Sequence, residues 1–357
     1  MNIKIHSSEI NRMMKTISQC IDTRDIGNRA NIEIGSLNNQ LYIHSSNGNM
    51  IATMTTPMLG LDKDKFCVDG QMFAKVCAMC SGEIDISTDG KNCIIKGTGR
   101  TRLPIVNAII PKHKDILQGK MLKVAAEDII HGYNRVAHAV SADNSRIQLT
   151  GILMESVSRK LTMTALDGFQ MSVESAECDG YDMRIIVPAS FLKIVSQALS
   201  PNETVEFITD GSSLTACTDS MTITCGLLAG EYPPVDKILP TEFKTECLVK
   251  VDEIKNALKS GSVVNSRQNL VKMEIGTTSI KVMNNSEEAD YEAEVSCETN
   301  GNGLMIAFNL KYLMNTMNTI DGETAVMHFN SSTSPCVVTE KDGNGIRLLL
   351  PVRVAQG

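Results

Sequence analysis

Apolar residues along this chain follow two spacings, one typical of helices and one typical of strands. Between residues 69 and 80 they recur at intervals of three, four and seven, as at Met72, Phe73, Val76 and Met79, which predicts a helix with one apolar stripe. Shorter runs alternate apolar and polar residues, which predicts half-buried strands. Six such helices are predicted, each after a strand, at residues 8–20, 69–80, 126–140, 188–199, 252–264 and 309–320. Because a single stripe must pack on one face of a sheet, the pattern predicts an α+β fold with antiparallel sheets.

The order of these elements repeats about every 119 residues, a third of the chain. Each third has an acid at the start of its first helix, an arginine after that helix, and then a second strand and helix. The matching positions in chain order are Glu9, Asp128 and Glu253, then Arg29, Arg146 and Arg267, and then Val68, Val187 and Phe308. We therefore predict three similar domains, at residues 1–119, 120–244 and 245–357, each with two helices packed on antiparallel sheets. The alternative is coincidental α+β patterning without a repeat.

Two of the thirds carry an Asp-Gly pair between alternating strands, at residues 89–90 and 210–211. This pair is a strong hairpin signal, because both central residues of the tightest hairpin turn take positive φ. We therefore expect hairpins at both places. The last third has a Ser-rich loop at the matching position, and its final hairpin is expected to turn at residues 341–345.

The composition is that of an ordinary folded protein, with 42% hydrophobic and 21% charged residues. The net charge is −7, and aromatic residues make up 4% of the chain, with no Trp. These values argue against proteins that bind nucleic acid with a wholly basic surface or with stacked aromatic residues. The first residues form no apolar leader, and no run approaches the ~18 apolar residues of a membrane span. We therefore expect a cytoplasmic protein without membrane contact.

The eleven cysteines are scattered singly, except for the pair Cys77 and Cys80. A zinc site built on such a pair needs a second ligand pair at matching spacing, and the sequence has none. A redox pair is expected at the start of a helix, whereas this pair falls inside a helical pattern. We therefore expect buried, reduced thiols.

The motifs of the common enzyme classes are missing from the sequence. It contains no phosphate-binding GxxxxGK[ST], no GxSxG nucleophile motif and no zinc-binding HExxH. His131 and His138 lie seven residues apart on one predicted helix, but no third ligand is placed near them, so we interpret them as structural. These residues favour a non-catalytic binding or scaffold protein without cofactor or metal. An enzyme that uses Cys or His is the alternative.

Charge is unevenly placed on the six predicted helices. Acidic residues occupy the first turns, where they complement the helix dipole. Basic residues occupy the bodies, at Arg12, Lys15, Lys75, Arg135, Lys193, Lys255, Lys259 and Lys311. The helices therefore either present basic faces to a polyanion or carry ordinary surface charges.

Four motifs occur in order from residue 145 onward. They are SRIQLTGILMES followed by LTMTALDGFQMSV, IIVPASFLKIVSQAL from residue 185, GEYPPVDKILP from 230 and IRLLLPVRV from 346. Together with the threefold repeat, they resemble the bacterial DNA polymerase III β subunit, the replicative sliding clamp family. The resemblance implies two chains joined head to tail in a six-domain ring that encircles duplex DNA and tethers the polymerase without catalysis. It implies as partners double-stranded DNA, the polymerase III catalytic subunit, an ATP-driven clamp loader and other clamp-binding replication and repair proteins.

The resemblance also implies three sets of binding residues. A groove for a short partner peptide would comprise Leu149, Leu166, Gly168, Phe169, Gln170, Met171, Pro233, Lys237, Ile238, Thr333, Pro335, Leu348, Leu349, Leu350, Pro351, Val352 and Arg353. DNA contacts are implied at Arg24, Gln71, Ile147 and Gln148, and we add Arg29, Arg146 and Lys193 from their places in the repeat and on the helices. The apolar pair Val263 and Val264 would lie at the interface between chains.

Four groove positions depart from the family pattern. Where the family typically has Thr, His, Arg and a second Arg, this chain has Leu166, Phe169, Gln170 and Lys237. Losing Arg removes a bidentate donor and adding Phe enlarges the apolar wall, so an altered partner preference is expected. Two alternatives stay open. Many of the apolar groove residues are simply core, or the chain is a clamp-like paralogue whose polymerase or loader partnership is altered or lost.

Overall fold

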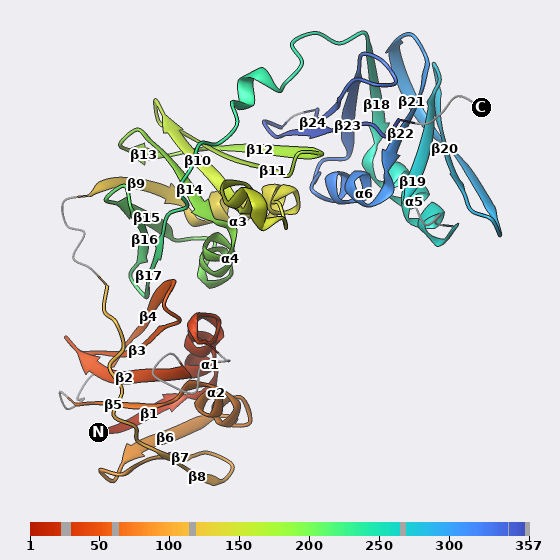
Figure 1. Cartoon of the computed structure of the whole chain (residues 1–357). Helices are drawn as coiled ribbons and strands as arrows, with labels where there is room; N and C mark the ends of the chain where they lie inside the picture. The colour runs from red at the N-terminus through yellow and green to blue at the C-terminus, as the bar shows by residue number, and fades with distance from the viewer. Residues whose placement is uncertain (23–29, 59–63, 114–118, 265–268, 342, 354–357) are drawn as a thin grey trace. The chain divides into compact units, whose positions relative to one another are not determined.

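The computed structural model describes residues 1–22, 30–58, 64–113, 119–264, 269–341 and 343–353 (Figure 1). The chain divides into two compact units. Unit 1 comprises Met1–Ile130, Cys178–Met183 and Ser190–Leu227, and unit 2 comprises His131–Glu177, Arg184–Ala189 and Leu228–Gly357. The domain boundaries expected at residues 119 and 244 stay a prediction.

Unit 1 holds two antiparallel sheets. The four-stranded sheet has the order β1 (Asn2–His6), β6 (Glu83–Thr88), β7 (Asn92–Lys96) and β8 (Arg100–Pro104). The nine-stranded sheet has the order β13 (Asp179–Gly180), β9 (Lys120–Ala125), β15 (Thr204–Thr209), β16 (Ser213–Thr218), β17 (Met221–Gly226), β4 (Met50–Pro57), β3 (Gln40–Ser46), β2 (Asn31–Leu37) and β5 (Lys65–Asp69). Strands β4 and β17 pair from Met50↔Cys225 to Met54↔Met221, so segments far apart in the sequence are neighbours in one sheet.

Unit 2 is built around one twelve-stranded antiparallel sheet. Its order is β14 (Met183–Pro188), β10 (Gly151–Val157), β11 (Lys160–Leu166), β12 (Gln170–Glu177), β25 (Ile346–Leu349), β24 (Cys336–Glu340), β23 (Thr324–Phe329), β18 (Thr245–Lys250), β21 (Asp290–Gly301), β20 (Ser279–Asn285), β19 (Leu270–Ile275) and β22 (Leu304–Asn309). Strands β12 and β25 pair from Gln170↔Leu349 to Val173↔Ile346. Strand β25, near the end of the described residues, therefore lies between β12 and β24 in the sheet, although β12 is far from it in the sequence.

All six predicted helices are present in the structure. They are α1 (Ser7–Ile17), α2 (Gly70–Ala78), α3 (Ala126–Val136), α4 (Ala189–Ala198), α5 (Val251–Gly261) and α6 (Leu310–Asn318). Three begin at a side-chain cap: His6 Nδ1 accepts from Ser8 N at 3.3 Å, Asp69 accepts from Met72 N at 2.7 Å, and Asn309 accepts from Lys311 N at 3.0 Å. The α-helical parts end earlier than predicted. Three continue as single 3-10 turns, η1 (Ser18–Cys20), η3 (Ala137–Ala139) and η6 (Ser262–Val264).

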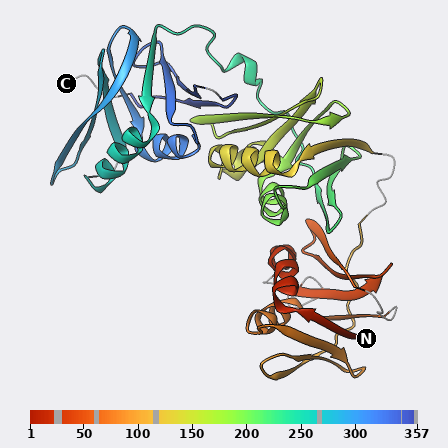
Figure 2. The ribbon, with the colours of Figure 1, turned by 180° about the vertical axis from the view of Figure 1, so that it is seen from behind.

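The helices cover the sheets with the single apolar stripe that the sequence predicts. Helices α5 and α6 lie side by side on the strands β18 to β22 (Figures 1 and 2). Ile254 and Leu258 of α5 and Leu313 and Met317 of α6 are buried in the core between the helices and the sheet. The order of strand and helix recurs as β1–α1, β9–α3 and β18–α5, and again as β5–α2, β14–α4 and β22–α6. The α+β fold with antiparallel sheets is therefore confirmed.

The eleven cysteines all lie within the described residues and form no disulfide; nine are buried, and Cys80 and Cys217 are half-buried. Burial raises the pKa of Cys77 to about 12, so this thiol stays protonated at neutral pH. Within the described residues no three His, Cys, Asp or Glu side chains gather as a metal site. None of the described helices is long and apolar enough to cross a membrane.

Candidate functional site

Unit 2 contains a set of buried apolar side chains apart from the core under α5 and α6, here named the apolar cluster. Its members are Leu149, Leu153, Leu166, Met171, Val173, Ile186, Tyr232, Val337 and Leu348. They come from β10, β11, β12, β14, β24 and β25, from η4 (Asn144–Thr150), and from the segment between β17 and β18. Tyr232 anchors that segment, because its hydroxyl donates to Thr164 O at 3.2 Å.

Strands β12 and β25 carry opposite chemistry on their two faces. Met171 and Val173 of β12 and Leu348 of β25 belong to the apolar cluster. Because successive side chains on a strand point to opposite faces, the residues between them face away from it. On β12 those residues are polar, and Ser172 lies directly opposite Arg347 of β25. The two strands thus separate the apolar cluster from a polar layer.

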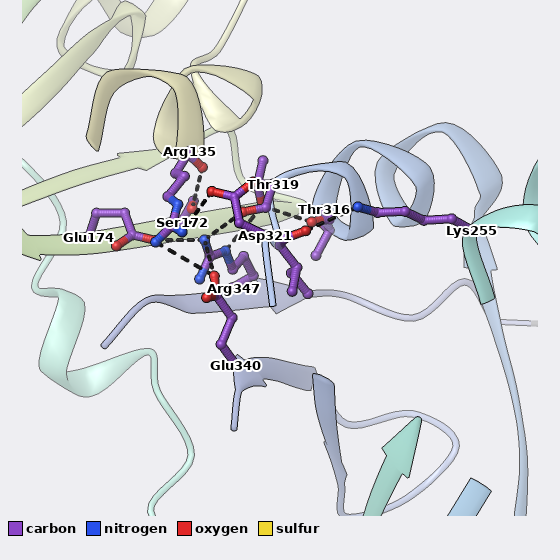
Figure 3. Close-up of polar contacts among 10 residues, drawn as sticks. Arg135, Ser172, Glu174, Lys255, Thr316, Thr319, Asp321, Glu340 and Arg347 are labelled. Carbon is purple, nitrogen blue, oxygen red and sulfur yellow. Dashed lines mark hydrogen bonds and ion pairs between the residues drawn. The ribbon is translucent and has the colours of Figure 1, made fainter. Parts of the chain in front are cut away.

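That layer contains the polar cluster, formed by Arg135, Glu174, Asp321, Glu340 and Arg347 (Figure 3). Arg347 is fully buried, and its Nη2 donates to Glu174 Oε1 at 2.6 Å and to Thr319 O at 3.1 Å. Arg135 of α3 donates to Asp321 at 2.8 Å. A buried charge is tolerated when it is paired and hydrogen-bonded, and this network supplies both conditions.

Two opposing effects act on the charges of the polar cluster. Burial raises the pKa of Glu174, although Arg347 and Arg135 act to lower it. Burial likewise lowers the pKa of Arg347, against the attraction of Glu174 and Glu340. Glu174 therefore depends on its arginine partners to remain charged, and removal of one of them leaves a buried carboxylate with less compensation.

At the edge of the apolar cluster, the turn between β11 and β12 presents an exposed aromatic ring. Asp167 Oδ1 accepts from Phe169 N at 2.8 Å, and Gly168 takes a φ of 96°, which favours glycine. Phe169 is 60% exposed, and its ring stacks on Tyr312 of α6 with centroids 6.1 Å apart. Leu350 N donates to Phe169 O at 2.8 Å, which ties the chain's last strand to this turn.

The groove residues expected from the sequence fall into four groups. Leu149, Leu166, Met171 and Leu348 lie in the apolar cluster, and Leu349 lies in the separate core under α5 and α6. Those that are exposed are Gly168, Phe169, Lys237, Ile238, Thr333, Leu350, Val352 and Arg353, whereas Pro233, Pro335 and Pro351 are half-buried. The polar layer holds Gln170, which is buried and donates to His138 O at 2.9 Å. The accessible part of the expected groove is therefore the exposed group.

Sequence reasoning missed six residues of this region: Leu153, Val173, Ile186, Tyr232, Val337 and Tyr312. Alternation along the strands marks Leu153 and Val337 as buried, but it does not say which core they join. Tyr312 looks like one more helix residue until the turn that carries Phe169 is placed against α6. Only the contact of its ring with Phe169, which is far away in the sequence, marks Tyr312 as part of this region. Local patterning carries no information about such contacts.

Within the part of the chain that the structure describes, the residues expected to contact DNA lie on three elements, η4, α2 and α4. Arg24 and Arg29 fall outside the described residues. Arg146 and Ile147 are exposed in η4, where Asp143 accepts from Ser145 N at 2.8 Å and so fixes the turn. Gln148 and Gln71 are half-buried, and Lys193 is exposed on α4.

The basic residues on the helix bodies do not all remain on the surface. Arg135 points into the polar cluster, and Arg12 is paired with Glu9 at 2.7 Å. Lys255 Nζ donates to Ile320 O at 3.0 Å (Figure 3). Together with Lys259, Lys255 also lines a pocket of about 340 Å³ that α5 and α6 share. The predicted basic helix faces are thus reduced to Lys15, Lys75, Lys193, Lys259 and Lys311, all of which are exposed.

The expected interface pair lies in the 3-10 turn that follows α5. Val263 is 86% exposed, and Val264 is half-buried. A large apolar side chain left so fully in water is a candidate contact for another protein surface.

Comparison with known proteins finds matches to DNA polymerase III beta subunits. Two family models match, "DNA polymerase III beta subunit, central domain" over residues 123–234 and "DNA polymerase III beta subunit, C-terminal domain" over residues 236–353. The Streptococcus pneumoniae "Beta sliding clamp" is 27% identical over 280 residues, covering 75% of this chain and 72% of that protein. The Bacillus subtilis "Beta sliding clamp" is 25% identical over 290 residues, covering 78% and 77%. A DNA polymerase III subunit beta from Pseudomonas aeruginosa, solved with bound griselimycin, superimposes with a TM-score of 0.93 at 18% identity over 99% of this chain and 100% of that one.

Proposed function

The chain belongs to the DNA polymerase III beta subunit family, and from that premise we propose that it is a sliding clamp, the processivity factor of a replicative polymerase. Two copies would join head to tail into a closed ring around duplex DNA, since such contacts close when one rotation returns to the start. The observation that carries the proposal is the match of the two family models along residues 123–353 on a fold shared with solved clamps. The protein would act by binding alone, without a catalytic step, in the cytoplasm where bacterial DNA is copied.

For partner proteins, we propose the exposed edge of the apolar cluster as the binding surface. Phe169, Tyr312, Leu350 and Val352 offer apolar area there, and the cluster beneath them gives a rigid base. Such a surface suits a short peptide with aliphatic and aromatic residues, from the polymerase, the clamp loader or another replication or repair protein. The buried residues of the expected groove would support this surface without touching the peptide.

Contact with DNA would be loose and independent of sequence. Exposed basic residues such as Arg146 and Lys193 are single charges on their elements. This arrangement suits screened attraction to phosphates and provides no recognition of the nucleotide bases. A protein that must move along DNA gains nothing from tight, directed hydrogen bonds. The net charge of −7 is compatible with this, because only the faces toward DNA need be basic.

Solution mass tests the ring first. Light scattering at several concentrations in moderate salt should give a mass near twice the 38.9 kDa of one chain, unchanged on dilution. Once loaded by its clamp loader on a nicked circular plasmid, the protein should stay with the DNA through gel filtration and be lost after the plasmid is linearised. A monomer at every concentration, or equal retention on linear and circular DNA, would contradict the proposal.

A clamp-like paralogue with a lost partnership is not favoured, because the relatives cited above are themselves named beta sliding clamps. The departures at Phe169 and Lys237 would then change which peptide is preferred, and leave the role unchanged. Binding of the replicative polymerase's C-terminal peptide from the same organism would support the shared role. If that peptide does not bind, the clamp-like paralogue becomes the better interpretation.

A further inference from the structure

The segment that follows β8 crosses one face of the nine-stranded sheet in unit 1; residues 105–113 of it are here named the strap. Val106 N donates to Cys67 O of β5 at 2.9 Å. Farther along, Pro111 O lies 2.7 Å from His44 Nε2 of β3, and the His113 ring reaches β4 and β17. The strap thus meets β5, β3, β4 and β17 in the order in which they lie in the sheet. Its far end bridges the join between β4 and β17.

Two imidazoles and two threonine hydroxyls form a continuous hydrogen-bonded chain under the strap. His44 Nδ1 lies 2.8 Å from Thr53 Oγ1, and Thr53 Oγ1 lies 2.9 Å from His113 Nε2. His113 Nδ1 in turn lies 2.7 Å from Thr224 Oγ1, which is 2.9 Å from Thr215 Oγ1. All four ring nitrogens therefore make hydrogen bonds, and this series of hydrogen bonds runs from the carbonyl of Pro111 in the strap to the middle of the sheet.

The donors in this chain can be assigned from its end. Pro111 O only accepts, so His44 Nε2 carries a proton, and a neutral His44 must then accept at Nδ1 from the Thr53 hydroxyl. Because Thr53 spends its proton there, His113 Nε2 must donate to Thr53, and His113 Nδ1 must accept from Thr224. Both rings are consequently neutral and carry their proton on Nε2. A second proton on His44 would turn its Nδ1 into a donor, so the Thr53 hydroxyl proton would lose its acceptor.

We propose that His44, Thr53, His113 and Thr224 form a latch that holds the strap across the join of β4 and β17 while both imidazoles are uncharged, and releases it when they are protonated. The charged groups that bear on His44 are Glu33 of β2, Lys65 of β5 and Lys112 of the strap. Glu33 and Lys65 balance each other in an ion pair at 2.9 Å, and Lys112 opposes a charge on His44. His44 is the titratable group that bears on His113. None of these neighbours therefore offers a free carboxylate to hold a charged imidazole in place.

Burial of the two rings supports the latch. It lowers the pKa of His113 to about 4 and also lowers the pKa of His44, so both stay neutral at physiological pH. The strap would be fixed at neutral pH and released in acid. This inference stands on unit 1 alone and does not depend on the proposed function.

Long-range ¹H–¹⁵N NMR on the full chain with ¹⁵N-labelled histidine tests the latch directly, with His44→Gln and His113→Gln supplying the assignments. We expect both rings to carry their proton on Nε2 at pH 7.5, and to remain neutral at pH 6.5, where an ordinary imidazole is half protonated. A proton on Nδ1 of either ring, or half protonation near pH 6.5, would overturn the proposal.

Limited trypsin digestion tests what the latch holds. The rate of cleavage after Lys112 at pH 7.5, followed by mass spectrometry, reports how often the strap leaves the sheet. Thr53→Val removes both central hydrogen bonds at nearly constant shape and should speed this cleavage about tenfold. Thr56→Val, on the opposite face of β4, should leave it unchanged. Equal cleavage rates for the unmodified chain and Thr53→Val would show that the latch does not hold the strap.

Hydrogen exchange tests release by acid. Peptides covering the strap should lose protection about tenfold between pH 7 and pH 4, after correction for the intrinsic rate, while peptides from β6 and β7 keep theirs. Unchanged protection of the strap at pH 4 would exclude a latch that opens on protonation.

Discussion

At the scale of single residues, the buried charges around Arg347 have the largest consequences. This side chain sits in an apolar run, Ile346 to Leu350, and is fully buried opposite Ser172. Its charge is tolerated because Glu174 and Glu340 lie on either side of it, within 3.4 Å. Glu174 lies 173 positions away from Arg347 in the sequence, so no local pattern could have predicted that the two side chains meet in the polar cluster.

Replacing Arg347 with Ala should lower the free energy of unfolding by about 3–5 kcal/mol, because Glu174 and Glu340 would stay buried without their closest cation and keep only Arg135, at 3.5 and 3.6 Å. Urea unfolding of the full chain measures the loss. The matched control is Arg184→Ala, which breaks the exposed pair with Glu155 and should change stability by about 0–1 kcal/mol. Equal losses in the two variants would show that burial does not set the cost.

Phe169 should matter to binding and little to folding, since its ring is mostly in water. Phe169→Ala should weaken binding of the polymerase C-terminal peptide about tenfold, by removing apolar area and the stack on Tyr312. Fluorescence anisotropy with a labelled peptide measures this. Val157→Ala, which also removes an exposed apolar side chain from unit 2, serves as the control. An unchanged affinity for Phe169→Ala would move the partner site elsewhere.

The Asp-Gly hairpins show how a correct local prediction can rest on an incomplete reason. Both hairpins are present, and Gly90 and Gly211 have φ of 88° and 86°. The aspartates do not share that conformation. Asp210 Oδ1 instead accepts from Ser212 N at 2.9 Å and Ser213 N at 2.7 Å, and these bonds lower its pKa. The residue types predicted a turn, and the side-chain acceptor decides its form.

At the scale of elements, helices and hairpins could be predicted because each is made by neighbours in the sequence. The six helices and the order of strand and helix follow from spacing alone. The pairings of β4 with β17 and of β12 with β25 do not, because they join strands far apart in the chain. The candidate partner surface depends on the second pairing, which is why its supporting residues came from a resemblance and Tyr312 was missed.

The tail that follows β25 is an element with its own test. Val352 N donates to Ala307 O at 2.8 Å, so the tail is held beside β22 next to the exposed turn that carries Phe169. Deleting residues 351–357 should abolish binding of the partner peptide and leave the two-chain mass unchanged. Calorimetry for the peptide and light scattering for the mass check the two halves. Retained peptide binding would exclude the tail from the site.

Acid should weaken unit 1 through its buried imidazoles. The folded-state pKa of His113, about 4, lies below the ordinary value near 6.5, so the stability it contributes is complete above pH 6.5 and is lost as the pH falls toward 4. Unfolding free energy should therefore fall by about 2 kcal/mol between pH 7 and pH 5 through this group. In urea titrations, His113→Gln should reduce that pH dependence. An undiminished dependence in the variant would assign it to other groups.

At the scale of the whole molecule, assembly rests on surfaces that one chain leaves exposed. Val263 is such a residue, and a charge in its place cannot be buried against a partner without a large desolvation cost. Val263→Glu should shift the protein from two chains toward one at micromolar concentration, as measured by analytical ultracentrifugation. Val157→Glu, exposed on the turn after β10, is the control and should leave the mass unchanged. A stable two-chain mass for Val263→Glu would place the interface elsewhere.

The continuous sheets also determine how the molecule responds to force. Where the first third of the chain meets the second, β4 and β17 share a ladder of five residue pairs, and β12 and β25 share one of four farther along. A pull across either join must break these backbone hydrogen bonds in a row. Each join should therefore resist separation as a whole, since no bond of the ladder opens without loading its neighbours. A machine that opens a ring of such chains at the contact between two of them would leave both ladders whole.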